Sequence, residues 1–400
     1  MNKFQNICGR VISLIQYVVG YLFVRPKKDR IGFMSLQDYS DNARALSEYV
    51  CDNFSMDYEI IWFVKNPLEC KKNHSYSNIR FVSNVKNANH FKWNTIKYAY
   101  SCDAVFYTHN FVLSSRFKNK NQLRINLWHG CGYKSMEKGK QASRFDYVLV
   151  PGNIFIKTKA EFFGVDEQKV LPIGYPRYDY MMKESKSAED FINRLRLENK
   201  RIVIWMPTFR ATNGGDYPEN SQVWDYELPI LKDNIQLSKL DKFCKENSLV
   251  LCIKRHPFQK EYLCENLALT NIRFIDNSDL EQNNIELYSM LRYTDALISD
   301  YSSVAIDYLL LDKPIAFALD DYEKYKNVRG FVFEDPLKYM PGNHLYTYTD
   351  LLEFLDDISR GNDTLKNKRD EIMTDVHNVT NNYCMRVWEV YLNMIKEELD

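Results

Sequence analysis

The sequence has no net charge and lacks the short motifs of the common nucleotide-binding and hydrolytic enzymes. Its 53 basic and 53 acidic side chains cancel, so no general attraction to nucleic acid is expected, and an anionic ligand must be held by a few placed groups. A Walker A motif, a G-x-G-x-x-G after the first predicted strand, a G-x-S-x-G elbow and an H-E-x-x-H pair are all missing. P-loop hydrolysis, serine-hydrolase chemistry and zinc proteolysis are therefore not indicated.

Metal-binding and disulfide patterns are also lacking. The nine cysteines are scattered, with no C-x-x-C pair and no Cys/His ligand spacing, which fits a reduced cytosol. No Asp-x-Asp pair follows a predicted strand to hold a divalent cation on a nucleotide diphosphate. We therefore expect neither a metal nor another cofactor, and expect cationic side chains and a helix N-terminus to neutralise phosphate charge.

The apolar run at residues 11–24 is too short to cross a membrane. It has fourteen residues, contains Gln16, and is flanked by Arg10 and by Arg25, Lys27 and Lys28, whereas a bilayer needs roughly 20 apolar residues. Basic flanks around an apolar segment favour a helix lying on an anionic membrane surface. An ordinary buried first helix is the alternative, and a signal peptide fits least because no small-residue cleavage site follows.

Short apolar strands alternating with helical segments predict two α/β halves, each with a parallel sheet covered on both faces. Expected strands are 30–35, 59–64, 79–82, 104–107, 124–128, 147–150, 170–173, 201–206, 249–254, 272–275, 296–299 and 314–318. The predicted division is a membrane-associating helix at 1–28, an N-terminal domain at 29–158, a C-terminal domain at 159–368, and a C-terminal helix at 369–400 that packs back toward the N-terminal domain.

Polar clusters follow several of these strands, where ligands of open parallel sheets bind. His129 follows the strand at 124–128 and is suited to take a proton from a hydroxyl near neutral pH; taken alone, a structural histidine is equally favoured. Arg177 lies in a Gly/Pro turn at 174–179 and offers a fork for phosphate or carboxylate, although a simple turn with a surface arginine is the alternative.

Three further clusters lie in the C-terminal half. Thr208 and Arg210 end one strand, and Lys254, Arg255 and His256 end the next, where the alternative is a solvated charged run. The third cluster, at 299–308, contains Asp300, Ser302 and Ser303 before a predicted helix. Backbone N–H groups of a helix start bind anions, and hydroxyls add further donors.

In this order, the clusters resemble the CDP-glycerol glycerophosphotransferase family of teichoic-acid and capsule biosynthesis. The motifs that carry the resemblance are WHG at 128–130, GYPRYD at 174–179, MPTFR at 206–210, KRHP at 254–257 and SDYSSVAIDY at 299–308. The resemblance implies the GT-B fold, in which two Rossmann-like domains face a central cleft. It also implies an N-terminal acceptor domain and a C-terminal domain for the CDP donor.

The resemblance further implies residue roles. His129 matches the general base and His256 the second important histidine, which contacts the diphosphate. Donor binding falls on Arg177, Thr208, Arg210, Lys254, Arg255, Asp300, Ser302 and Ser303, and Lys134 and Asn42 are assigned to the acceptor side. Cys131, Gly132 and Tyr133 stand where the family commonly has a Thr-Pro-like pair, Tyr178 replaces an Asn, and no Asp-Gly-Lys-Ala-Ser segment precedes Arg386.

The expected activity is transfer of glycerol phosphate, or a related polyol phosphate, from CDP-glycerol or CDP-ribitol with release of CMP. The expected acceptor is a glycan or teichoic-acid chain on a polyprenyl diphosphate, and the expected location is peripheral, on the cytoplasmic face of the cell membrane. Because no further N-terminal module precedes the domains, addition of one or few units is favoured over polymerisation. The alternative is a GT-B glycosyltransferase with a nucleotide-sugar donor, for which Asp307 and Asp320 are the candidate sugar-binding acids.

Overall fold

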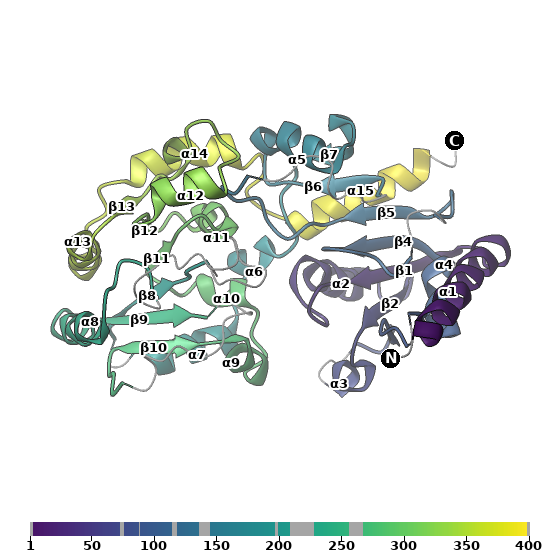
Figure 1. Cartoon of the computed structure of the whole chain (residues 1–400), viewed down its shortest axis with the longest axis horizontal. Coiled ribbons are helices and arrows are strands. Elements are labelled where there is room, and N and C mark those ends of the chain that lie inside the picture. The colour runs from purple at the N-terminus through teal and green to yellow at the C-terminus, as the bar shows by residue number, and fades with distance from the viewer. Residues whose placement is uncertain are drawn as a thin grey trace. The chain divides into compact units, whose positions relative to one another are not determined.

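The computed structural model describes residues 3–72, 76–87, 89–113, 118–135, 145–196, 199–208, 228–255 and 267–397. They form two α/β units, each built on its own parallel sheet (Figure 1). The first unit comprises Met1–His129, Lys138–Asp179 and His377–Asp400, and the second comprises Gly130–Glu137 and Tyr180–Val376. The predicted α/β fold with two parallel sheets is therefore confirmed.

The sheet of the first unit has seven strands in the order β3-β2-β1-β4-β5-β6-β7. The strands are β1 (Lys27–Met34), β2 (Glu59–Val64), β3 (Ile79–Ser83), β4 (Cys102–Tyr107), β5 (Leu123–Asn126), β6 (Tyr147–Leu149) and β7 (Val170–Leu171). Its helices are α1 (Lys3–Phe23), α2 (Asp41–Phe54), α3 (Pro67–Lys72), α4 (Trp93–Ser101), α5 (Ile156–Phe163) and α15 (Tyr383–Glu397). The order reverses between β1 and β4, which is the switch point where doubly wound sheets bind ligands.

The sheet of the second unit has six strands in the order β10-β9-β8-β11-β12-β13. The strands are β8 (Arg201–Trp205), β9 (Leu249–Lys254), β10 (Ile272–Ile275), β11 (Ala296–Ser299), β12 (Ile315–Ala318) and β13 (Asn343–Leu345). Its helices are α7 (Lys186–Leu195), α8 (Asn234–Glu246), α9 (Asn277–Gln282), α10 (Leu287–Leu291), α11 (Ser303–Tyr308), α12 (Tyr322–Val328), α13 (Tyr348–Arg360) and α14 (Lys366–Val376). The short α6 (Tyr178–Met182) spans the division between the units.

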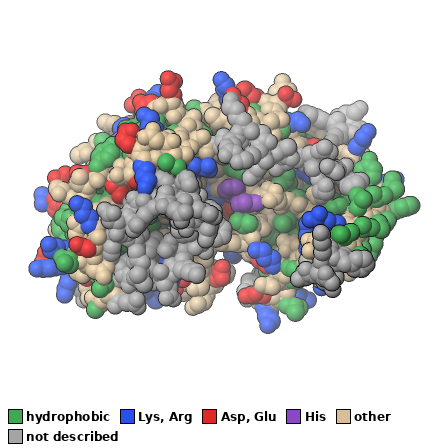
Figure 2. All heavy atoms as spheres, in the orientation of Figure 1, with side chains coloured by type: hydrophobic (Ala, Val, Ile, Leu, Met, Phe, Trp, Pro, Cys, Tyr) green, Lys and Arg blue, Asp and Glu red, His purple; other side chains and the backbone are tan. Residues whose placement is uncertain are grey.

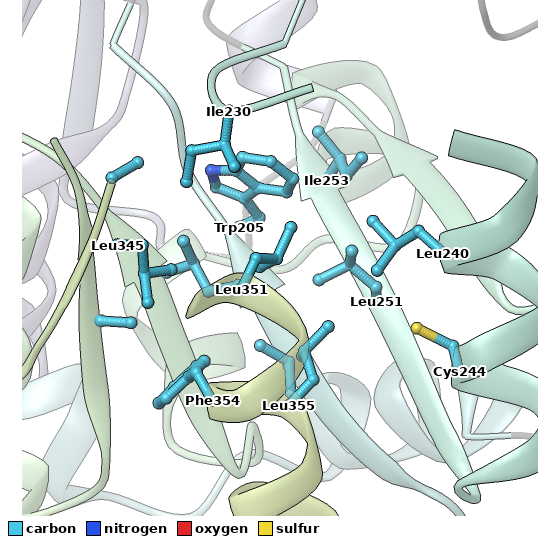
Figure 3. Close-up of a cluster of buried hydrophobic side chains, with 14 of the residues drawn as sticks. Trp205, Ile230, Leu240, Cys244, Leu251, Ile253, Leu345, Leu351, Phe354 and Leu355 are labelled. Atoms are coloured by element: carbon cyan, nitrogen blue, oxygen red, sulfur yellow. The ribbon is translucent and has the colours of Figure 1, made fainter. Parts of the chain in front are cut away.

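Figure 3 shows the core of the second unit, where α13 lays Leu351, Phe354 and Leu355 over the sheet. Trp205 of β8 and Leu251 of β9 meet these side chains, and all five are at least 98 % buried. β9 is buried along its whole length, as expected for a strand of a parallel sheet that is covered on both faces. This packing holds the carboxyl ends of β8, β9 and β11 as a rigid edge.

Helix α1 packs on the first unit through a narrow face. The Gln16 amide donates to the Phe91 carbonyl at 2.7 Å, and Gly20 lies so close to α4 that a Cβ would meet the Tyr100 ring at 2.3 Å. Most of the remaining surface of α1 is apolar and exposed, with Arg10 as an exposed cation. Its exposed side chains, which lie at the right edge of Figure 2, include Ile7, Val11, Leu14, Ile15, Val18, Leu22 and Phe23.

Several boundaries differ from those expected. The first unit runs to Asp179 rather than to 158, because β7 hydrogen-bonds to β6 as the seventh strand of the first sheet. β1 already begins at Lys27. The expected single tail helix is two helices: α14 belongs to the second unit, and α15 packs on α2 in the first.

Candidate active site

The backbone around His129 is held in an unusual conformation. Leu127 extends the β5 ladder by donating to the Tyr107 carbonyl at 2.7 Å, and the Trp128 amide then donates to the Asn126 side chain at 2.9 Å. Trp128 has a φ of 53°, a left-handed conformation that is uncommon for a bulky residue and must be imposed by its surroundings. This turn places His129 at the carboxyl edge of the first sheet.

Asn42 imposes that turn from the start of α2. Its side-chain amide donates to the Trp128 carbonyl at 2.8 Å, and its oxygen accepts the Arg177 backbone N–H at 3.1 Å. The Asn42 side chain is completely buried. Arg177, also buried, donates from its guanidinium to Asp41 at 2.8 Å. In the first unit, Asn42 and Arg177 therefore brace the two loops that carry the WHG and GYPRYD motifs.

His129 is oriented by the residues that end β4. Its Nδ1 lies 3.2 Å from the Thr108 carbonyl oxygen, and because a carbonyl only accepts, neutral His129 carries its proton on Nδ1. Nε2 is then the basic nitrogen. The His109 ring stacks on the His129 ring with centroids 3.9 Å apart and planes within 8°, and Trp128 tilts against it at 4.0 Å.

The electrostatic surroundings keep His129 neutral. Burial lowers its pKa well below the ordinary value, and His109, Lys159 and Arg177 lower it further, while the hydrogen bond to Thr108 acts in the opposite direction. The pKa of His109 is also lowered, mainly by burial, with Asp41 opposing the shift. Both imidazoles are therefore unprotonated at neutral pH, as a proton acceptor requires.

Lys159 of α5 adds a buried cation to the same part of the first unit. It is 1 % exposed, and its ammonium lies 4.4 Å from the centroid of the Trp128 ring. A cation at this distance over an indole face is attracted by the ring quadrupole. It fixes Trp128, and through it the conformation of the WHG turn.

The GYPRYD motif also anchors α15. The Asp179 carboxylate accepts the backbone N–H groups of Tyr383 and Cys384, each at 2.9 Å, at the first turn of the helix. Gly174 has a φ of 77°, and a Cβ there would lie 2.5 Å from the Tyr383 ring. A carboxylate at a helix N-terminus is favoured by the macrodipole. This motif therefore has a structural role in the first unit in addition to carrying Arg177.

In the second unit, Asp300 links the ends of two neighbouring strands. It is completely buried, accepts the Thr208 backbone N–H at 2.8 Å, and also accepts the Thr208 hydroxyl. Thr208 follows β8 and Asp300 follows β11, and these strands are paired. The two predicted donor-binding residues are brought together, with Asp300 holding the MPTFR motif at Thr208.

The serine pair lies at the next turn, where the chain that follows His129 enters the second unit. Ser302 precedes α11 and makes no side-chain capping bond, and Ser303 is the first helical residue. Gly132 lies against this turn, since a Cβ on it would be 2.9 Å from the Ser303 nitrogen. Lys134 pairs with Phe331 in a β-bridge. Lys134, predicted for the acceptor side, thus belongs to the second unit and lies on the segment that covers α11.

The cations that end β9 have partners within the second unit. The buried Lys254 ammonium donates to the Asn277 side chain at 2.6 Å, and burial lowers its pKa to about 8. Arg255 pairs with Asp276 at 2.5 Å. His256 and Arg210, predicted for the diphosphate, lie outside the described residues. Among those described, there is no group of three or more His, Cys, Asp or Glu residues placed to hold a metal ion.

Sequence reasoning missed His109, Thr108, Asp41 and Lys159. The available signal for the first two was their position, because Thr108 and His109 follow β4, whose neighbour β5 leads to His129. Adjacent parallel strands bring their carboxyl ends together, so polar residues after both should meet. Lys159 carried no comparable signal, since it lies within a helix.

Comparisons with known proteins agree with the motifs. The model of a family described as CDP-Glycerol:Poly(glycerophosphate) glycerophosphotransferase matches residues 17–385, most of the chain. The teichoic acid ribitol-phosphate polymerase TarL of Staphylococcus aureus (strain NCTC 8325 / PS 47) is 29% identical over 62% of this chain and 44% of its own. The chain thus spans less than half of that relative.

Two further matches extend over nearly the whole chain. A teichoic acid poly(glycerol phosphate) polymerase of Bacillus spizizenii (strain ATCC 23059 / NRRL B-14472 / W23) is 26% identical over 94% of this chain and 93% of its own. The structure of the wall teichoic acid polymerase TagF, in a histidine-to-asparagine variant soaked with CDPG, superposes with a TM-score of 0.72 at 22% identity and covers 100% of both chains. At this identity the superposition shows the shared fold.

Proposed function

The chain belongs to the CDP-glycerol:poly(glycerophosphate) glycerophosphotransferase family, and on that premise we propose that it transfers a polyol phosphate from a CDP-activated donor to a lipid-linked envelope acceptor. Glycerol phosphate from CDP-glycerol is the preferred donor group, and ribitol phosphate is the variant. An acceptor hydroxyl oxygen bonds to the β-phosphorus of the donor, the bond from that phosphorus to the bridging oxygen breaks, and CMP leaves. A teichoic-acid or capsule chain is the acceptor class.

The geometry of His129 carries this proposal. Its Nδ1–H is committed to the Thr108 carbonyl at 3.2 Å, so Nε2 is the atom that takes the acceptor proton during attack. A depressed pKa keeps the ring unprotonated but makes it a weak base. Its unprotonated Nε2 is available to the acceptor hydroxyl at neutral pH without prior loss of a proton.

We assign the donor to the second unit and the acceptor to the first, as in a GT-B enzyme with two Rossmann-like domains. The carboxyl edge of the second sheet carries Ser302, Ser303 and Arg255, and the family resemblance gives a donor-binding role to Arg210 and His256, which lie outside the described residues. Phosphoryl transfer of this kind depends mainly on positioning and on stabilisation of charge. Asp300 and Lys254 support the edge through their own hydrogen bonds.

Helix α1 supports a location at the membrane surface. The apolar run at 11–24 was expected to be too short to cross a bilayer, but the helix that contains it is longer. Asn6–Phe23 is long and apolar enough to span a bilayer by length and composition, and 17% of it is buried. Gln16 ties it to Phe91 and Gly20 packs against α4. These contacts favour a helix lying on the surface over one that leaves the unit to cross the bilayer. Arg25, Lys27 and Lys28 follow it in the sequence and add attraction to anionic lipid, although Lys27 also pairs with Glu59 at 3.0 Å. We propose peripheral attachment to the cytoplasmic face.

The described residues give the glycosyltransferase alternative no specific support. Asp307 is completely buried and accepts the Tyr288 hydroxyl at 2.5 Å. Asp320 accepts the Ile230 backbone N–H at 2.9 Å. Both carboxylates that were candidates for gripping a sugar have structural hydrogen bonds in the second unit.

The decisive experiment measures CMP release by the purified protein, with detergent-solubilised envelope lipids as acceptor. CDP-glycerol, CDP-ribitol and nucleotide sugars are supplied separately, with and without a chelator. CMP release from a CDP-polyol that survives chelation supports the proposal and identifies the polyol. Product from a nucleotide sugar alone would reject it.

Membrane attachment is tested by sedimentation with anionic vesicles. Leu14→Asp, on the exposed face of α1, should lower the bound fraction, because a charged side chain on the apolar face opposes insertion. Met56→Asp is the matched control, since Met56 is 95% exposed on a loop outside α1. Equal binding by both variants and the wild type would show that α1 does not attach the protein.

A further inference from the structure

The face-to-face contact of two imidazoles in the first unit has no role in the reaction described so far. The His109 and His129 rings lie 3.9 Å apart and nearly parallel, close enough that two positive charges would repel strongly in a partly buried setting. His129 alone supplies the basic nitrogen. His109 therefore either fills space or controls its neighbour.

Thr108, at the end of β4, contacts the rings of both histidines. Its backbone carbonyl lies 3.2 Å from His129 Nδ1, and its hydroxyl lies 3.0 Å from His109 Nδ1. Thr108 is completely buried, and its own N–H donates to the Met34 carbonyl at 3.2 Å, which continues the β1–β4 ladder. The sheet thus sets the plane of both rings through one residue.

Charged groups face this pair from three elements. Asp41 of α2 favours a proton on His109, whereas Arg177 disfavours one on either ring. Lys159 of α5 disfavours a proton on His129. With these charges in place, the protonation of the two rings is coupled. A proton on one ring reduces the proton affinity of the other.

We propose that His109 is a positioning residue for the transfer reaction: its ring holds the His129 ring in the orientation that presents Nε2, and its charge state decides whether His129 can take the acceptor proton. When His109 is neutral, it places no opposing charge beside the imidazolium that forms on His129 during attack. When His109 is protonated, it opposes that imidazolium. This inference rests on the proposed role of His129 as the base.

Two substitutions separate orientation from charge. His109→Phe retains an aromatic face for stacking but does not titrate, and His109→Ala removes both. His344→Phe is the matched control, because His344 is a half-buried histidine of the second unit whose pKa is also lowered by burial. Melting temperatures establish that each variant is folded.

The primary measurement is an NMR pH titration of the histidine rings in folded, ¹³C-histidine-labelled protein without substrate. The His129 signal is assigned as the one that is missing from the spectrum of His129→Asn. In the wild type, the two rings should titrate as a coupled pair. In His109→Phe, His129 should titrate in one step, with its midpoint at higher pH, because the opposing charge is gone. His344→Phe should leave the His129 titration unchanged. An unchanged His129 midpoint in His109→Phe would overturn the proposal.

Turnover supplies the second measurement. His109→Phe should keep kcat near the wild-type value at neutral pH and move the acid limb of kcat/KM to higher pH. His109→Ala should lose on the order of tenfold or more in kcat without a change in donor KM, since the base is no longer held in line. Wild-type kcat in a folded His109→Ala would refute positioning. If no CDP-polyol yields CMP with the wild type, the proposed function fails, whereas the NMR titration still decides whether the two rings are coupled.

Discussion

Replacement of Asn42 by leucine should destabilise the first unit, because this side chain holds two loops at once. Its amide group donates to the Trp128 carbonyl at 2.8 Å and its oxygen accepts the Arg177 N–H at 3.1 Å, in a completely buried site. Leucine has the same number of side-chain heavy atoms and the same branching at Cγ, but it neither donates nor accepts. The Asn42→Leu variant thus leaves a buried carbonyl and a buried N–H without these partners.

The size of the effect follows from those two groups. A buried polar group that loses its partner costs about 1–3 kcal/mol, so the free energy of unfolding should fall by about 3 kcal/mol. For a unit of this size, that corresponds to a melting temperature lower by about 6–12 °C. Trp128, at a φ of 53°, loses the contact that imposes its strained turn, so His129 shifts and turnover falls with stability.

Differential scanning calorimetry and CMP release test this reasoning together. Asn53→Leu is the matched control, because Asn53 lies on the same helix with an exposed amide bonded to the Tyr49 carbonyl, and its loss should change stability by less than about 0.5 kcal/mol. If Asn42→Leu melts like the wild type and only the acceptor KM rises, Asn42 contacts the acceptor and the bracing role is refuted.

Three other substitutions test the remaining parts of the site. His129→Asn should lower kcat at least about 100-fold with donor affinity measured by calorimetry unchanged; a parallel loss of donor binding would contradict the base assignment. Asp179→Ala should lower the free energy of unfolding by about 1–2 kcal/mol, since it uncaps α15, and an unchanged melting temperature would exclude that role. Lys254, with a pKa lowered to about 8 from 10.5, binds fewer protons folded than unfolded between those values. The free energy of unfolding of the wild type should therefore rise relative to that of Lys254→Met between pH 8 and 10.5, by up to about 3 kcal/mol. Parallel pH profiles for the two proteins would show that the pKa of Lys254 is not lowered.

The strands could be predicted from the sequence because each is a continuous local run of apolar residues. β2, β9, β10 and β11 have the predicted bounds, as buried strands of a parallel sheet carry their signal in consecutive apolar residues. β13 was missed because Asn343 and His344 interrupt that signal and the strand has three residues. The tail is two helices because α14 ends at Val376 and α15 begins only at Tyr383, directly after Asn382, whose φ of 53° is not helical.

Part of the site could be predicted from the sequence for a related reason. Position at or just after the end of a strand singled out His129, Thr208, Lys254 and Asp300, because the carboxyl edge of a sheet is defined by the strands themselves. The partners of these residues come from segments distant in the sequence. Arg177 meets Asp41 across 136 positions, and no local pattern encodes such a pair.

The sequence by itself determined the two parallel sheets, the motifs at their edges and the family, because apolar periodicity and short motifs are properties of neighbouring residues. Only the tertiary structure decided what those residues do to one another. In the folded chain the Asn42 side chain bonds to the Trp128 carbonyl, Asp179 caps α15, and the His109 ring stacks on the His129 ring. Tautomer, strain and pKa depend on burial and on distances of a few ångströms, and folding alone sets these.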